Sequence, residues 1–188
     1  QFNLGDPKTL TDFLNYGYKN YNADKYDLIL YDHGGAIDGA IYDDLSDDNL
    51  SLEDMSKALK DSPFNSKNKL EAVLFRTCLN GTIELANVFN NYSEYLIASE
   101  EISYGANYTD VLGFLNNVLP DDNGLEFGKK YVDAYDNQMT ILNPFDEMVQ
   151  TYSVIDLSYI DKLNEELDKY IKEIDLVKYG INITNVID

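Results

Sequence analysis

The sequence predicts an α/β domain with a mainly parallel sheet flanked by helices. Short apolar runs that favour strands alternate with longer segments that carry one apolar stripe, as in βαβ units. The strand-like runs are apolar without alternation, which is typical of strands buried on both faces. With 188 residues, 44% of them hydrophobic, the chain can bury one core, so we expect residues 1–188 to form a single domain.

The sequence pattern predicts two helices and one strand in the first third of the chain. An acidic N-cap followed by proline predicts a helix from Asp6. A buried strand is expected at 26–31, and the Gly- and Asp-rich segment 36–50, which has no period, is predicted to be a long surface loop. A serine-capped helix follows over 51–60. The apolar stripe of the first helix falls on Leu10, Phe13, Leu14, Tyr18 and Tyr21.

The rest of the chain continues the alternation of strands and helices. A second buried strand is expected at 70–75, a helix over 83–89, and a third short strand at 95–98, followed by a polar loop over 99–107. The remaining expectations are helices near 109–119 and 124–137, a strand near 151–155, and a helix with its stripe on Ile160, Leu163, Leu167, Ile171 and Ile174.

The composition argues against two classes of partner. The chain has 34 acidic and 14 basic residues, a formal net charge of −20. Phosphate recognition needs clusters of Lys and Arg, so this balance argues against nucleic-acid binding. It also disfavours docking on an anionic membrane, and no apolar run approaches the roughly 20 residues of a membrane span.

Two rare residues follow two of the predicted strands. His33 comes just after strand 26–31, and Cys78 comes just after strand 70–75; each is the chain's single residue of its type. A single cysteine rules out both an internal disulfide and the usual four-ligand Cys/His zinc site. Because the carboxyl ends of parallel strands meet at one sheet edge, the two side chains are expected to share one substrate.

The chemistry of this pair suits nucleophilic catalysis. A partly ionised thiol is a strong nucleophile, and an imidazole can activate it or protonate a leaving amine. Cys78 also precedes a helix expected from about residue 80, whose N-terminus would favour the thiolate. The alternative is that Cys78 is a small core residue and that His33 has only a structural role.

Several segments together resemble clan CD cysteine peptidases, and within that clan the clostripain family. The block that ends in His33-Gly34 resembles the family's histidine block, and the segment from Cys78 resembles its nucleophile block. Four segments agree in order, namely 3–13, 28–35, 78–84 and 96–101, and the segment 151–157 resembles a later family segment.

The resemblance implies a caspase-like three-layer sandwich and a cysteine endopeptidase that acts on peptides or proteins. We expect no cofactor. Cys78 would attack the scissile carbonyl, and His33 would protonate the leaving amine. The N–H groups of Gly34 and Cys78 would bind the oxyanion. The resemblance also implies a bacterial protein that is secreted or displayed at the cell surface.

Arg76 departs from the family pattern. The family usually has an acidic residue two positions before the nucleophile, at the floor of the S1 pocket, where it selects Arg or Lys. Here that position is Arg76, followed by Thr77, and with Ser99 these are the expected substrate-binding residues. A guanidinium would repel a basic P1 side chain and favour an acidic one. The alternative is that Arg76 pairs with Glu100 or Glu101, which leaves S1 neutral or acidic.

The length is a second departure. The family normally has one or two strands before the point where this chain starts. The resemblance therefore implies a domain that is incomplete at its N-terminus and part of a longer protein. The missing strands would be removed, or would come from a second chain of the same precursor.

An acidic cluster at 43–49 lies between the two rare residues. Residues 34–56 contain no Lys or Arg, so self-cleavage after a basic residue is unavailable there, whereas an acid-accepting S1 pocket would make the cluster a candidate site. Its spacing does not follow an EF-hand, so we expect a solvated loop rather than a Ca²⁺ site.

Two other functions remain in view. An inactive clostripain-like homologue would serve as a binding or surface protein, and covalent labelling of Cys78 would distinguish it from an enzyme. A nucleotide-binding domain would need a phosphate loop, and Gly34-Gly35 matches neither common pattern.

Overall fold

The computed structural model describes residues 2–103, 111–142 and 151–173. The chain divides into two compact units, Gln1–Leu157 and Ser158–Asp188. The first unit contains the sheet and the candidate site. The second contains helix α6 (Ile160–Glu173), which follows a short 3₁₀ turn, η2 (Leu157–Tyr159).

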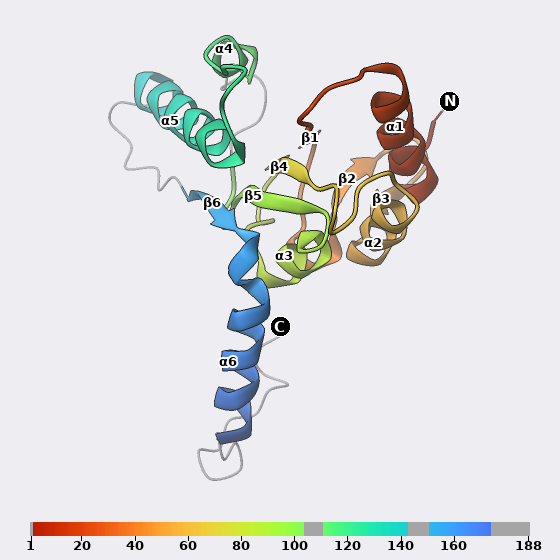
Figure 1. Ribbon diagram of the computed structural model, residues 1–188, viewed down its shortest axis with the longest axis vertical. Coiled ribbons are helices and arrows are strands. Elements are labelled where there is room, and N and C mark those ends of the chain that lie inside the picture. Colours follow the sequence, from red (N-terminus) through yellow and green to blue (C-terminus); the bar gives the residue numbers. More distant parts are fainter. Residues whose placement is uncertain (1, 104–110, 143–150, 174–188) are drawn as a thin grey trace. The chain divides into compact units, whose positions relative to one another are not determined.

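A four-stranded sheet forms the centre of the first unit (Figure 1). The strands β1, β4 and β5 are parallel, and β6 pairs antiparallel with β5, which confirms the mainly parallel sheet. Tyr31 on β1 is paired in register with Arg76 on β4, so these two strands end at the same level. In spatial order the strands are β1 (Asp27–Tyr31), β4 (Leu70–Arg76), β5 (Ser93–Ser99) and β6 (Tyr152–Asp156).

Helices cover both faces of this sheet, which gives the predicted three layers (Figure 1). One face carries α4 (Val111–Leu115) and α5 (Gly124–Leu142). The other carries α1 (Pro7–Asn20), α2 (Leu52–Lys60) and α3 (Ile83–Phe89). The predicted N-caps of α1 and α2 are confirmed, because the side chains of Asp6 and Ser51 accept hydrogen bonds from the backbone N–H groups of Lys8 and Asp54.

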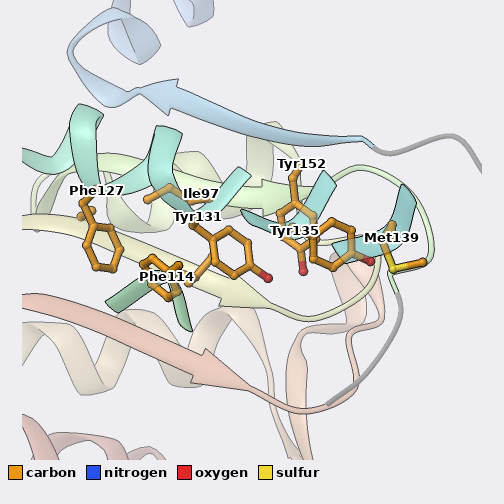
Figure 2. Close-up of a cluster of buried hydrophobic side chains, with 9 residues drawn as sticks. Ile97, Phe114, Phe127, Tyr131, Tyr135, Met139 and Tyr152 are labelled. Atoms are coloured by element: carbon orange, nitrogen blue, oxygen red, sulfur yellow. The ribbon is translucent and has the colours of Figure 1, made fainter. Parts of the chain in front are cut away.

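Two apolar cores lie against the two faces of the sheet. Figure 2 shows the core beneath α5, where aromatic rings pack edge to face, among them Tyr131 on Tyr152 with centroids 5.1 Å apart. On the other face, Phe75 of β4 packs at 80° against Phe89 of α3. Full burial of a Leu, Val or Phe side chain stabilises the fold by roughly 1.5–3 kcal/mol. The cluster in Figure 2 comprises Ala72, Leu74, Ile97, Phe114, Phe127, Tyr131, Tyr135, Met139 and Tyr152.

The prediction of one long surface loop over 36–50 is wrong, although residues 44–48 are exposed. The segment contains a 3₁₀ turn, η1 (Ala36–Asp38), and an antiparallel hairpin of β2 (Ala40–Asp43) and β3 (Asp48–Leu50). Backbone pairing, a buried carboxylate and the buried side chains of Ala40, Ile41 and Leu50 hold this hairpin. These few apolar residues are too scattered in the sequence to give a period.

That carboxylate belongs to Asp43, which is only 8% exposed. It accepts hydrogen bonds from the backbone N–H groups of Leu4, Leu45 and Ser46. The bond from Leu4 is the largest of the effects that lower the pKa of Asp43. The acidic cluster is therefore partly internal, and it holds the N-terminal segment against the hairpin.

Other boundaries differ in detail from the expectations. In the α1 stripe, Leu10 and Leu14 are buried, whereas Phe13 and Tyr21 are exposed. Helix α5 extends to Leu142, beyond the predicted end at 137. The expected loop over 99–107 and helix over 109–119 fall partly on residues 104–110, which lie outside the described residues, as does Ile174.

In the second unit, α6 carries the predicted apolar stripe, with Leu163, Leu167 and Ile171 exposed. Across residues 2–103, 111–142 and 151–173, no helix is long and apolar enough to cross a membrane.

Candidate active site

His33 and Cys78 stand at equivalent places on neighbouring strands. His33 lies two residues after Tyr31, and Cys78 lies two residues after Arg76. Tyr31 and Arg76 are paired in register on the two strands. Both side chains line one pocket of about 460 Å³ at the carboxyl ends of β1 and β4. The structure thus brings together His33, Arg76 and Cys78, as the sequence predicts. The lining residues are Tyr31, Asp32, His33, Arg76, Cys78, Ile102 and Ser103.

Gly34 allows the histidine loop to lie directly on the cysteine loop. A Cβ atom at this position would overlap the carbonyl oxygen of Cys78 and the side-chain oxygen of Asn80. Any other residue would therefore push the two loops apart. Within the described residues, neither Gly34 nor Cys78 uses its backbone N–H in a hydrogen bond, and their role as donors to an oxyanion stays a prediction.

Asn80 joins these two loops through its side chain, and sequence reasoning did not single it out. Its side chain is fully buried, and Nδ2 donates to the carbonyl oxygen of Gly39 at 3.2 Å. Its Oδ1 accepts from the hydroxyl of Thr77 at 2.6 Å. The only sequence signal is its position two residues after Cys78, inside the segment that carries the family resemblance.

The expected helix begins later than predicted. Helix α3 starts at Ile83 rather than near residue 80, and Leu79 turns the chain after Cys78 with a φ of 61°. The hydroxyl of Thr82 accepts from the backbone N–H of Leu85, so this cap occupies the helix N-terminus. The expected support of the thiolate by this helix is therefore not what the structure provides.

Ser103 supplies the polar contacts of the Cys78 sulfur. Its backbone N–H donates to Sγ at 3.3 Å, and its carbonyl oxygen accepts from the thiol at 3.4 Å. The Ser103 hydroxyl donates to the carbonyl oxygen of Thr77 at 3.0 Å and accepts from the hydroxyl of Tyr152 at 3.3 Å. Sequence reasoning did not identify Ser103, which lies 25 residues after Cys78.

Arg76 places a buried positive charge at the pocket. The residue is 3% exposed, and its guanidinium carbon lies 4.5 Å from the centre of the Tyr31 ring. Burial raises the pKa of Tyr152, and the charge of Arg76 acts against that rise. The charge of Arg76 therefore acts on the aromatic core under α5 as well as on the pocket.

Thr77 and Ser99 lie outside the pocket lining. Both side chains are buried, and the hydroxyl of Ser99 donates to the carbonyl oxygen of Glu101 at 3.0 Å. Direct contact of these two residues with a substrate stays a prediction. Among the described residues, no group of three or more His, Cys, Asp or Glu side chains could hold a metal ion.

Comparison with known proteins gives one family. The family model of the clostripain family matches residues 1–186. Clostripain from Hathewaya histolytica is 30% identical over 121 residues, which cover 56% of this chain and 23% of that protein.

Solved structures show the same fold. A secreted C11 cysteine protease from Bacteroides thetaiotaomicron in complex with an irreversible peptide inhibitor has a TM-score of 0.62 at 19% identity, over 85% of this chain and 47% of that chain. An inactive zymogen C11 protease from Parabacteroides distasonis has a TM-score of 0.52 at 21% identity, over 85% of this chain and 42% of that chain. At these identities the likeness shows the fold alone, and this chain spans less than half of either structure.

Proposed function

Because this chain belongs to the clostripain family of cysteine proteases, we propose that it hydrolyses peptide bonds as a cysteine endopeptidase with Cys78 and His33 as its catalytic dyad. The observation that carries this proposal is the shared pocket. Both side chains line it at the carboxyl ends of β1 and β4, which end at the same level. His33 is exposed and Cys78 is half-buried, so a peptide can reach both.

The proposed reaction has two stages. The Cys78 sulfur attacks the scissile carbonyl carbon, and the resulting oxyanion accepts hydrogen bonds from the N–H groups of Gly34 and Cys78. His33 gives a proton to the leaving amine as the C–N bond breaks. Water then hydrolyses the thioester, which releases the acid and restores the thiol. Two residues on opposite sides of the peptide bond can do this without a direct thiol–imidazole hydrogen bond.

The proposed specificity at P1 is shifted away from Arg and Lys and toward acidic side chains. Arg76 lines the pocket with a guanidinium that is always protonated and that pairs well with carboxylates. The same charge repels a basic P1 side chain. Tyr31, packed on the guanidinium, forms part of the same wall.

Fluorogenic peptides with Asp, Asn, Arg or Lys at P1 test the proposal, with Cys78→Ala and His33→Ala as paired variants. We expect wild-type hydrolysis to be fastest with Asp at P1 and to be lost in Cys78→Ala. Loss of the general acid in His33→Ala should lower kcat about 10²–10⁴-fold. Efficient cleavage after Arg would refute the acidic-P1 assignment while leaving the peptidase assignment intact.

Covalent labelling separates an enzyme from an inactive relative. The chain has a single cysteine, so an acyloxymethyl-ketone peptide can report only on Cys78. We expect labelling in wild-type protein and markedly slower labelling in His33→Ala. A chain that neither labels nor hydrolyses any peptide of the panel would instead be a binding or surface homologue.

The proposal also places the protein outside a bacterial cell or at its surface. The Bacteroides thetaiotaomicron protease that shares its fold is described as secreted. Detection of the chain in the culture medium or on intact source cells would test this, and confinement to the cytosol would contradict it.

A further inference from the structure

We propose that Ser103 is a positioning residue for the nucleophile, which holds the Cys78 sulfur with its backbone while its hydroxyl anchors that backbone in place. This inference rests on the proposed function, because it assigns Cys78 as the nucleophile. It names a residue that lies far from the dyad in sequence, on the segment that follows β5.

Two backbone groups of Ser103 contact the sulfur of Cys78. The Ser103 N–H donates to Sγ at 3.3 Å, and the Ser103 carbonyl accepts from the thiol at 3.4 Å. Two contacts from one residue hold the sulfur in one orientation at the pocket wall. The Ser103 hydroxyl adds a third and longer contact, 4.0 Å from Sγ. The two shorter contacts come from main-chain groups, which no substitution at position 103 removes directly.

The side chain of Ser103 anchors those backbone groups. The Ser103 hydroxyl donates to the carbonyl oxygen of Thr77 at 3.0 Å and accepts from the Tyr152 hydroxyl at 3.3 Å. One bond ties Ser103 to the residue before the nucleophile, and the other ties it to the edge strand β6. An alanine at position 103 would lose both bonds and free the backbone that faces the sulfur.

These contacts affect the thiolate form of Cys78 more than the thiol form. When the Cys78 thiol ionises, it loses its hydrogen bond to the Ser103 carbonyl. A thiol is a weak hydrogen-bond donor, so this loss costs little free energy. A hydrogen bond from N–H to an ionised acceptor is roughly twice as strong as one between neutral groups. The Ser103 N–H therefore contributes most when Cys78 is the attacking thiolate, and its displacement should slow every reaction of that thiolate.

The test is the rate of alkylation of Cys78 by iodoacetamide as a function of pH, followed by mass spectrometry. This readout needs no peptide substrate, so its failure is distinguishable from failure of the proposed function. The variants are Ser103→Ala, which removes the anchor, Ser103→Thr, which keeps a hydroxyl, and Tyr152→Phe, which keeps the ring but loses one bond. If Ser103→Ala does not fold, Tyr152→Phe decides.

Ser93→Ala is the matched control. Ser93 is also buried, lies at the opposite end of β5, and donates its hydroxyl to the backbone carbonyl of Tyr95. We expect Ser103→Ala and Tyr152→Phe to slow alkylation at pH 7 about fivefold, the size of one lost hydrogen bond, and to move the pH profile upward. Ser103→Thr and Ser93→Ala should match the wild type.

Two results would overturn the proposal. Wild-type alkylation profiles in both Ser103→Ala and Tyr152→Phe would mean that the anchor has no effect on the sulfur. An equal slowing in Ser93→Ala would mean that general loosening of the sheet, and not the Ser103 contact, governs reactivity.

Discussion

Gly34 lies so close to the carbonyl oxygen of Cys78 that the Cβ atom of any other residue would overlap it. This contact joins the two loops that carry the proposed dyad. It explains why the residue after His33 has no side chain in this chain, since the approach of the loops leaves no space for one.

The first prediction follows from that contact. Gly34→Ala should separate the loops and lower kcat about 10²-fold, because small displacements of catalytic groups have effects of that size. Overpacking should also destabilise the fold by about 1–3 kcal/mol in urea unfolding. Peptide hydrolysis and a urea titration of the same preparation measure both effects.

Gly17→Ala is the control for this substitution. Gly17 lies within α1, and a Cβ atom there would meet nothing within 4 Å. The same change should stabilise the helix by roughly 0.5–1 kcal/mol and leave hydrolysis unchanged. Full activity in Gly34→Ala would show that the close approach of the loops is not needed.

A second prediction concerns Asn80, whose buried side chain bridges the two loops. Asn80→Asp keeps the acceptor for the Thr77 hydroxyl but replaces the donor to the Gly39 carbonyl with an oxygen. Two buried oxygens would then face each other, so we expect a loss of about 1–3 kcal/mol in thermal or urea unfolding. The loss should shrink at low pH, where a protonated carboxyl group can donate again. An unchanged stability at both pH values would contradict the bridge.

A third prediction concerns the contact between Tyr31 and Arg76, whose guanidinium carbon lies 4.5 Å from the ring centre. Tyr31→Leu removes the aromatic face, and a cation–π contact is worth roughly 0.5–1 kcal/mol at exposed sites. We therefore expect kcat/KM for Asp at P1 to fall about two- to fivefold in Tyr31→Leu. Tyr31→Phe keeps the ring and should retain most of the wild-type kcat/KM. Equal losses in both variants would attribute the effect to the Tyr31 hydroxyl instead.

A fourth prediction is a pH dependence of stability from Asp27. This residue is exposed at the edge strand β1, yet desolvation of its carboxyl group, with the charge of Glu71, raises its pKa to about 6. The folded state then binds this proton more tightly than the unfolded chain does. Asp27 therefore destabilises the fold above pH 6, and this effect disappears as the pH falls from about 6 to about 4.

Asp27→Asn should consequently raise Tm at pH 7.5 and change it little at pH 4. Asp24→Asn removes the same charge from an exposed position and controls for net charge. A Tm gain in Asp27→Asn that is as large at pH 4 as at pH 7.5 would exclude the titration of Asp27 as its cause.

Much of the fold could be predicted because its signals are local. The apolar runs of β1, β4 and β5 and the caps of α1 and α2 depend on neighbours within a few residues in sequence. The candidate dyad was predictable for the same reason, since His33 and Cys78 directly follow two such strands. The hairpin β2–β3 was missed because backbone pairing and the buried Asp43 carboxylate leave no apolar pattern, and its few buried apolar residues are too scattered to give a period.

The sequence alone therefore determined the α/β class, the succession of the main strands along the chain, and the two rare residues at the strand ends. Only the tertiary structure decided what surrounds them. Register places Tyr31 beside Arg76, and the path of the chain after β5 brings Ser103 to a sulfur 25 residues earlier. Such contacts depend on which strands pair and at what level, and strand pairing joins segments that carry no mark of each other in the sequence.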